Sequence, residues 1–183
     1  MTILNELHQD HINLNKLLVI LRHKVEKLRS GEHPNFGLMG DVVEYISTYA
    51  DAYHHPREDR MYEYLRGRSD NLDLAIDDCI AQHRHLKKLG EELCESVDSI
   101  LHDAVMPMDE FTDKLAAFVE EQSTHLNFEE GSLFPLVQGV ATENDWATLN
   151  NDLPSVEDPL FGEKQAARYA ELYQELLVDF NND

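Results

Sequence analysis

Four segments of the chain carry apolar residues spaced three and four positions apart, and this spacing is the feature that most limits how the chain can fold. Such spacing lines side chains along one face of an α-helix. The segments cover about residues 2–30, 38–66, 70–104 and 108–138, and none has the alternation typical of a β-strand. Because the connections between them are short, neighbouring helices should run antiparallel. The sequence therefore predicts an all-α, up-and-down four-helix bundle.

Each of the four predicted core faces contains one histidine, and two of these histidines are followed four residues later by a glutamate. The residues are His11, His54 with Glu58, His83, and His125 with Glu129. Residues at i and i+4 point from the same face of a helix. Counting about 1.5 Å per residue from the end that the helices share places all six at depths of about 12 to 20 Å. We therefore expect them to meet in one layer of the core.

A single histidine on a helix face is more often an ordinary core residue than a metal ligand. Six polar groups buried at one depth each need a partner, however, and a metal satisfies them together. Four imidazoles and two carboxylates exceed the four ligands of a zinc site and favour two metals bridged by the carboxylates. Nitrogen and oxygen ligands without a thiolate fit iron or manganese, of which we prefer iron, and differ from the all-oxygen sites of calcium and magnesium.

Pro56 lies between His54 and Glu58 and works against this arrangement. Inside a helix a proline removes the hydrogen bond to the Ala52 carbonyl and bends the axis. A kink with helical geometry on both sides keeps the pair usable, whereas a new helix starting there separates it. The adjacent His55 is left open as a bystander, a group that supports a ligand, or a substitute ligand. The other histidines fall mostly outside the predicted faces and are expected at the surface: His8, His23, His33, His85 and His102.

Charge and composition narrow the class of protein. Thirty-six acidic residues against fifteen Lys and Arg give a formal net charge of −21, which disfavours nucleic acid and anionic lipid as partners. The N-terminal residues lack the apolar stretch of a signal peptide or membrane span, so we expect a cytoplasmic protein that does not enter membranes. Cys79 and Cys94 lie about 22 Å apart on one predicted helix, too far for a disulfide, and are expected to be reduced, mostly structural thiols.

The chain changes character after Gly139, so we divide it into a bundle at residues 1–138 and a C-terminal helical extension at residues 139–183. Thr142 and Asp145 form a plausible capping box for a short helix around Trp146, and a loop with two prolines follows. The last segment should be a helix that packs its apolar face on the bundle or on a second chain in a homodimer. That face consists of Ala166, Tyr169, Leu172 or Tyr173, Leu176 and Phe180.

The motifs around the histidines resemble those of the hemerythrin-like, or HHE cation-binding, family in its bacterial form. They are DH at Asp10–His11, HHPRED at His54–Asp59, QHRHL at Gln82–Leu86 and HLNFEEGSLFPL at His125–Leu136. The resemblance spans about residues 3–138. Two pieces of the extension, NDW at Asn144–Trp146 and DPLFG at Asp158–Gly162, are also similar to bacterial members.

The resemblance implies a four-helix bundle with two non-haem iron ions bridged by carboxylates and by an oxo or hydroxo group. It implies that the iron ligands are His11, His54, Glu58, His83, His125 and Glu129, with both glutamates bridging. On the third helix, oxygen-carrying hemerythrins have a second histidine four residues after the first, where this chain has Lys87. That difference leaves water, His55 or another oxygen donor for the missing ligand.

Three functions fit these features. The first is a di-iron protein that binds or senses oxygen or a related small diatomic molecule without turning over a substrate. The second is a di-iron enzyme or iron handler, with ferrous oxidation, removal of peroxide or nitric oxide, or iron storage and donation as its activities. The third is a metal-free helical interaction module in which hydrogen bonds alone satisfy the polar layer. We expect the first, with a small diatomic or peroxide as the ligand.

Overall fold

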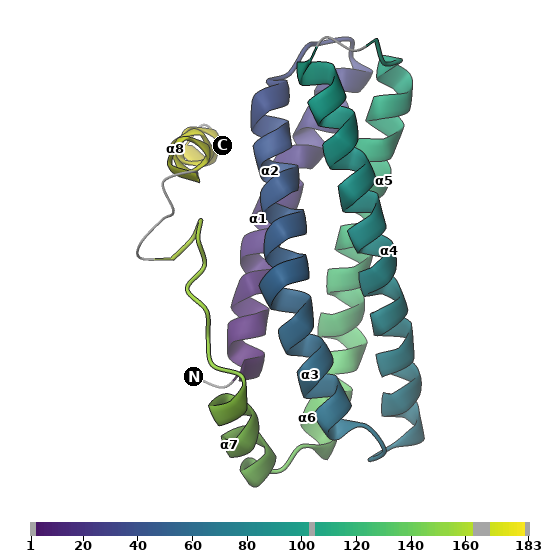
Figure 1. Ribbon diagram of the computed structural model, residues 1–183, viewed down its shortest axis with the longest axis vertical. Helices are drawn as coiled ribbons and strands as arrows, with labels where there is room; N and C mark the ends of the chain where they lie inside the picture. The colour runs from purple at the N-terminus through teal and green to yellow at the C-terminus, as the bar shows by residue number, and fades with distance from the viewer. Residues whose placement is uncertain (1–2, 103–104, 163–168, 182–183) are drawn as a thin grey trace.

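The computed structural model describes residues 3–102, 105–162 and 169–181 (Figure 1). Within these residues every regular element is helical. The bundle consists of α1 (Ile3–Arg29), α2 (Phe36–Tyr49) continued by η1 (Ala50–His54) and α3 (His55–Leu65), α4 (Asp70–Leu101), and α5 (Met108–Phe128) continued by η2 (Glu129–Leu133) and α6 (Phe134–Val140). The chain direction alternates from one long helix to the next, which confirms the predicted up-and-down bundle. The predicted end of the third helix, residue 104, lies outside the described residues.

Turn residues set the ends of the long helices close to where the sequence placed them. Gly31 and Gly67 have φ angles of 80° and 83°, which side-chain-bearing residues rarely adopt, and the chain leaves α1 and α3 beside them. Asn35 caps α2, its side-chain oxygen accepting a hydrogen bond from the Leu38 amide at 3.0 Å. The short connections that result bring successive helices back antiparallel.

Two prolines enter the bundle without ending its helices. Pro56 and Pro135 each stand in the first turn of a helix that follows a five-residue π-helical turn, η1 or η2. In η1 the His55 amide donates to the Ala50 carbonyl, and in η2 the Phe134 amide donates to the Glu129 carbonyl. The wider turn accommodates a residue that has no amide hydrogen. Helical geometry therefore continues on both sides of Pro56. This is the alternative that keeps His54 and Glu58 usable as a pair.

The core consists of two apolar clusters with a polar layer between them. One cluster occupies the end of the bundle where α1 meets α2 and includes Leu21, Val42, Phe111 and Phe118, each 0 % exposed. The other occupies the opposite end and includes Leu7, Met61, Leu72 and Leu133, also 0 % exposed. Along α1, His11 falls between Leu7 of one cluster and Leu14 of the other. The polar layer is therefore closed off by apolar side chains above and below.

The C-terminal extension contains α7 (Glu143–Asp152) and α8 (Ala170–Asn181). The predicted capping box is present at the start of α7, where Thr142 and Asp145 each bond the other's backbone. Figure 1 shows α8 end-on beside α2, which it contacts. Tyr169, Leu172 and Leu176 of the predicted face are buried with the apolar cluster of the bundle. Ala166 and the Phe180 side chain fall outside the described part of the chain.

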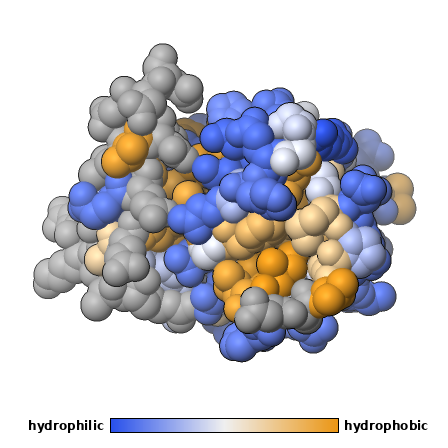
Figure 2. Space-filling view, turned by 90° about the horizontal axis from the view of Figure 1, so that it is seen from above, coloured by the Kyte–Doolittle hydropathy of each residue, from blue (hydrophilic) through white to orange (hydrophobic). Residues whose placement is uncertain are grey.

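The end of the bundle seen in Figure 2 shows apolar side chains among a mostly hydrophilic surface. This end carries the connections from α1 to α2 and from α4 to α5. Leu101, the last residue of α4, and Val105, in the second connection, are 53 % and 101 % exposed. Among the described helices, none combines the length and the apolar character needed to cross a membrane.

Candidate metal centre

The structure brings all six predicted ligand residues together in the polar layer. Their exposed fractions are 4 % for His11, 1 % for His54, 0 % for Glu58, 6 % for His83, 1 % for His125 and 0 % for Glu129. They come from α1, η1, α3, α4, α5 and η2, so all four long helices of the bundle contribute. The i and i+4 spacing places Glu58 beside His54 and Glu129 beside His125. Pro56 and the π-turns do not turn these side chains away from the layer.

One group of donors surrounds His11 and His54. Their Nε2 atoms are 3.0 Å apart. Glu58 Oε1 lies 3.4 Å from His11 Nε2 and 3.2 Å from His54 Nε2. Glu129 Oε2 lies 3.2 Å from His11 Nε2. The donor atoms of these four residues all lie within 4.8 Å of one another, so a single cation can contact them together.

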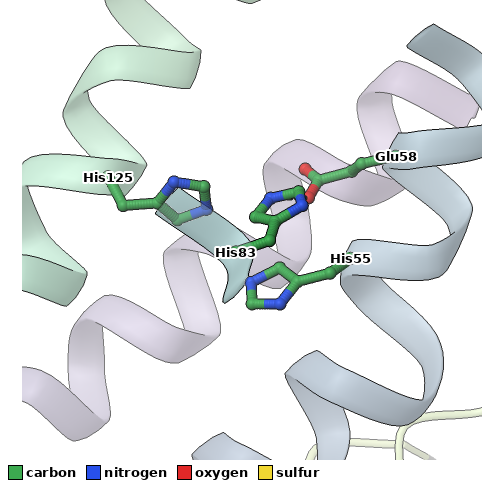
Figure 3. A group of neighbouring side chains, drawn as sticks. All are labelled: His55, Glu58, His83 and His125. Atoms are coloured by element: carbon green, nitrogen blue, oxygen red, sulfur yellow. Dashed lines mark ion pairs between the residues drawn. The ribbon is translucent and has the colours of Figure 1, made fainter. Parts of the chain in front are cut away.

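A second group surrounds His83 and His125 and uses the same two glutamates. Glu58 Oε2 lies 3.6 Å from His83 Nε2, and Glu129 Oε2 lies 3.3 Å from His125 Nε2. Figure 3 shows Glu58 and His55 from α3 converging with His83 and His125. Glu58 thus directs one carboxylate oxygen to each group of histidines. This is the arrangement in which a carboxylate bridges two metals.

The outward nitrogen of each of the four histidines is held by a polar side chain. The Nδ1 contacts are His11 with Glu130 at 2.7 Å, His54 with Asp10 at 3.2 Å, His83 with Asp59 at 2.9 Å, and His125 with Gln82 at 3.0 Å. An acceptor at Nδ1 fixes the ring and leaves the Nε2 lone pair for a metal. All four rings therefore offer Nε2 to the interior of the layer.

Several inward-facing atoms have no hydrogen-bond partner among the described residues. They are both carboxylate oxygens of Glu58, Oε2 of Glu129 and Nε2 of His125. Leaving a buried polar group without a partner costs on the order of 1–3 kcal/mol, and more when the group is charged. Cations between the two groups of donors would satisfy these atoms at once. The residues present therefore fit a metal-binding role.

The pKa values of the histidines in the layer depend on the neighbouring carboxylates as well as on burial. Burial acts to lower the pKa of His54, but the Glu58 charge and the Asp10 hydrogen bond outweigh it and raise that pKa to about 9. Burial likewise opposes the Asp59 hydrogen bond at His83, whose pKa rises to about 10. The carboxylates thus draw positive charge into the layer, from protons when no metal is bound.

Two other histidines are held neutral. Burial, with the nearby His83 charge, lowers the pKa of His125 to about 4 despite Glu129. Burial and the charges of His83 and His54 lower the pKa of His55 well below its usual value. A neutral imidazole keeps a lone pair that can bind a metal.

Sequence reasoning missed two residues that contact Glu129. The Tyr62 hydroxyl donates to Glu129 Oε1 at 2.7 Å, and the Cys79 thiol donates to the same oxygen at 3.1 Å. Cys79, expected to be structural, is free and buried in the layer. Tyr62 stands four residues after Glu58, and Cys79 four residues before His83. Both residues lie four positions from a predicted donor, but their contacts with Glu129 come from another helix, so the spacing alone does not reveal them.

His55, which the sequence left open, is buried against the second group of donors. Its ring stacks on His83 with centroids 4.0 Å apart and meets the edge of His125 at 5.4 Å. Lys87, at the position of the missing family histidine, has a 56 % exposed side chain that pairs with Asp51 at 3.6 Å. The histidines predicted at the surface are all exposed: His8, His23, His33, His85 and His102.

Comparison with known proteins identifies one family. No curated protein matches the chain. A family model described as the hemerythrin HHE cation binding domain matches residues 2–141, which contain the whole bundle and every donor described above.

Proposed function

The chain belongs to the hemerythrin HHE cation-binding family, and from this premise we propose that it is a non-haem di-iron protein that binds or senses oxygen or a related small diatomic molecule. Family membership and the buried histidine and glutamate clusters fit a metal-binding role. The observation that carries the di-iron proposal is the position of Glu58, whose two unpartnered oxygens face different pairs of histidines. A single ion held by either pair of histidines would face only one of these oxygens.

In this proposal His11 and His54 would hold one ion, and His83 and His125 would hold the other. Glu58 and Glu129 lie between the two pairs and would contribute to both positions. Nitrogen and oxygen donors of this kind suit iron. Iron bound there would supply the redox chemistry that reversible binding of a diatomic ligand requires. His55 stands beside the second pair as a neutral imidazole.

The surrounding residues orient the donors and exclude water. Phe134 stacks on the His11 ring with centroids 5.2 Å apart, and the two apolar clusters close the layer above and below. Tyr62 holds Glu129 by a hydrogen bond to Oε1. A cavity of about 520 Å³ between α1 and α5 is lined by His11, Asn15, Ser123 and Glu130. It brings solvent to the outward side of His11, where Glu130 contacts Nδ1.

The alternative is a di-iron enzyme or iron handler that oxidises ferrous iron, removes peroxide or nitric oxide, or stores and donates iron. The observation in its favour is the formal net charge of −21, which concentrates cations near the surface.

Oxygen exposure separates the two functions. Protein reconstituted with iron without air is mixed with oxygenated buffer in a stopped-flow spectrometer, and the oxygen is then removed. Binding predicts a long-lived spectral change that reverses when oxygen is withdrawn. Rapid irreversible oxidation, or repeated consumption of oxygen, peroxide or nitric oxide, would overturn the binding function in favour of the enzyme.

We also propose that residues 1–138 form the metal-binding unit and that residues 139–183 are an extension that packs on it. The burial of Tyr169, Leu172 and Leu176 supports packing within the chain, as does the hydrogen bond from the Tyr45 hydroxyl to Asp158 at 2.8 Å. A homodimer through this segment stays a prediction. Sedimentation of the full chain at several concentrations tests it.

A further inference from the structure

The geometry points to Cys79 as a thiolate ligand of the metal position at His83 and His125, which makes that position a mixed sulfur, nitrogen and oxygen site. Such a site takes a divalent ion with affinity for sulfur, such as Zn²⁺ or Co²⁺, as well as Fe²⁺. The inference rests on the proposed function, because it concerns one of the two metal positions proposed above. It adds a donor that neither the family description nor the sequence spacing of histidine and glutamate supplies.

Cys79 lies on α4 one turn before His83 and is 0 % exposed. Residues four apart on a helix present their side chains to the same region. The sulfur lies where the polar layer meets the apolar cluster around Leu72 and Leu133, to which Cys79 itself belongs. The thiol is therefore inside the closed layer, directly beside the second pair of histidines.

The distance from this sulfur to His83 is that between donors that share one ion, and its distance to Glu129 is slightly shorter because the thiol donates a hydrogen bond. Cys79 Sγ lies 3.5 Å from His83 Nε2 and 3.1 Å from Glu129 Oε1. His125 Nε2 lies 3.3 Å from Glu129 Oε2. A tetrahedral ion with bonds of about 2.3 Å to sulfur and 2.0–2.1 Å to nitrogen separates its donors by about 3.3–3.6 Å. The donor atoms of all four residues lie within 4.8 Å of one another.

A second, independent observation marks the same position as a ligand site. His125 Nε2 and Glu129 Oε2 have no hydrogen-bond partner among the described residues, and their side chains are 1 % and 0 % exposed. Both atoms belong to the group of donors that contains Cys79. A cation there satisfies both of these atoms and takes the sulfur lone pair.

Metal binding at Cys79 replaces the thiol proton with the ion. Without metal, the thiol proton is donated to Glu129 Oε1, which also accepts from Tyr62 at 2.7 Å. When the sulfur binds an ion, the thiol proton leaves to solvent and one Oε1 lone pair becomes free. The Tyr62 hydrogen bond remains and keeps the carboxylate in place.

The two metal positions therefore differ in their preference for ions. The position at His11 and His54 has only nitrogen and oxygen donors, whereas the position at His83 and His125 adds sulfur. Thiolate favours Zn²⁺ and Co²⁺, so these ions should fill the second position first.

Cobalt substitution tests the sulfur ligand directly. Reduced, metal-free protein is titrated with Co²⁺, and the near-ultraviolet thiolate-to-cobalt charge-transfer band is recorded. We expect the band in the native chain and its loss in Cys79→Ser. The matched control is Cys94→Ser, because Cys94 is on the same helix but lines a surface cavity with Ser47 and Glu91. Zinc affinity should fall at least about tenfold in Cys79→Ser and stay unchanged in Cys94→Ser.

Failure of this inference differs from failure of the proposed function. Cobalt bound without a charge-transfer band, or a band that persists in Cys79→Ser, overturns the sulfur ligand and leaves the di-iron proposal standing. Failure to retain either cobalt or iron overturns both. If Cys79→Ser does not fold by circular dichroism, X-ray absorption of the native cobalt protein decides. A sulfur shell at about 2.3 Å supports the ligand, and a shell of nitrogen and oxygen alone overturns it.

Discussion

The apolar cluster around Phe118 and the polar layer around Glu58 are built on the same helices but satisfy their buried groups in different ways. In the cluster, side chains such as Phe111 and Leu21 find all their partners in one another and are 0 % exposed. In the layer, both oxygens of Glu58 are equally buried and lack a hydrogen-bond partner among the described residues. The comparison teaches that apolar contacts alone satisfy the cluster, whereas the layer carries negative charge that protons or a bound cation must balance. The two regions should therefore respond oppositely to mutation.

The largest expected effect on folding comes from Phe118→Ala. Removing this fully buried ring should lower the free energy of unfolding by about 3–5 kcal/mol, because the cavity loses both burial and contacts. Urea unfolding of the metal-free protein measures the change. Leu74→Ala is the control, since Leu74 is 67 % exposed and its loss should change little. At a temperature where the variant is folded, its iron content should equal that of the native chain. A loss of iron in Phe118→Ala would mean that the cluster and the layer do not differ in this way.

Glu58→Ala should have the opposite effects: a large loss of metal affinity and a smaller change in the free energy of unfolding. It removes the carboxylate that reaches both pairs of histidines, so metal affinity should fall more than about a hundredfold, beyond the effect of losing an outer hydrogen bond. Unfolding of the metal-free protein should change less than in Phe118→Ala above pH 10, where His54 and His83 have lost their protons and no buried positive charge is left without a partner. Equilibrium dialysis against competing chelators gives the affinity, with the exposed Glu121→Ala as the matched control. Unchanged metal content in Glu58→Ala would mean that this carboxylate is not a ligand.

Asp59→Ala tests the hydrogen bond that orients one proposed ligand, His83. Asp59 Oδ1 accepts from His83 Nδ1 at 2.9 Å and fixes the ring that offers Nε2 to the layer. Losing this acceptor should weaken metal binding about 10–100-fold, less than the loss of Glu58. The exposed Asp78→Ala on α4 controls for the change in net charge. Equal affinities for the two variants would show that His83 needs no orienting partner.

The layer should also give the metal-free protein a pH dependence that the apolar cluster lacks. The folded-state pKa values of about 9 for His54 and about 10 for His83 exceed the unfolded value of about 6.5. Their protonated forms therefore stabilise the fold fully below pH 6.5, and this contribution is lost as pH rises through 9 to 10. The slope is up to about 1.4 kcal/mol per pH unit for each proton.

Denaturant unfolding with a chelator present, between pH 6.5 and 10, measures this loss. Metal affinity should rise over the same window, because fewer protons compete for the imidazoles. Stability of the metal-free protein that rises with pH would contradict the assigned charges of His54 and His83.

Spacing along each helix was enough to predict the bundle and the layer. The alternation of three and four fixes which face of a helix is buried, and counting residues fixes depth, so His11 and Glu129 could be placed together although they are far apart in sequence. The capping box at Thr142 was also readable, because a cap is made within four residues.

Contacts between helices were harder to predict. The π-turn before Pro56 was missed because a proline in a helical pattern normally indicates a break. Cys79 was read as apolar because a buried thiol fits a core face, and only the approach of Glu129 from another helix shows its polar contact. His55 could not be assigned, since its place beside His83 depends on the turn geometry of η1.

The most direct test of the central claim is the amount of metal bound per chain. The protein is reconstituted with iron without air, desalted, and analysed for iron, manganese and zinc by elemental analysis. Two pairs of histidines that share Glu58 and Glu129 predict about two iron ions per chain. A chain that retains no metal would contradict the claim that the polar layer is a metal centre.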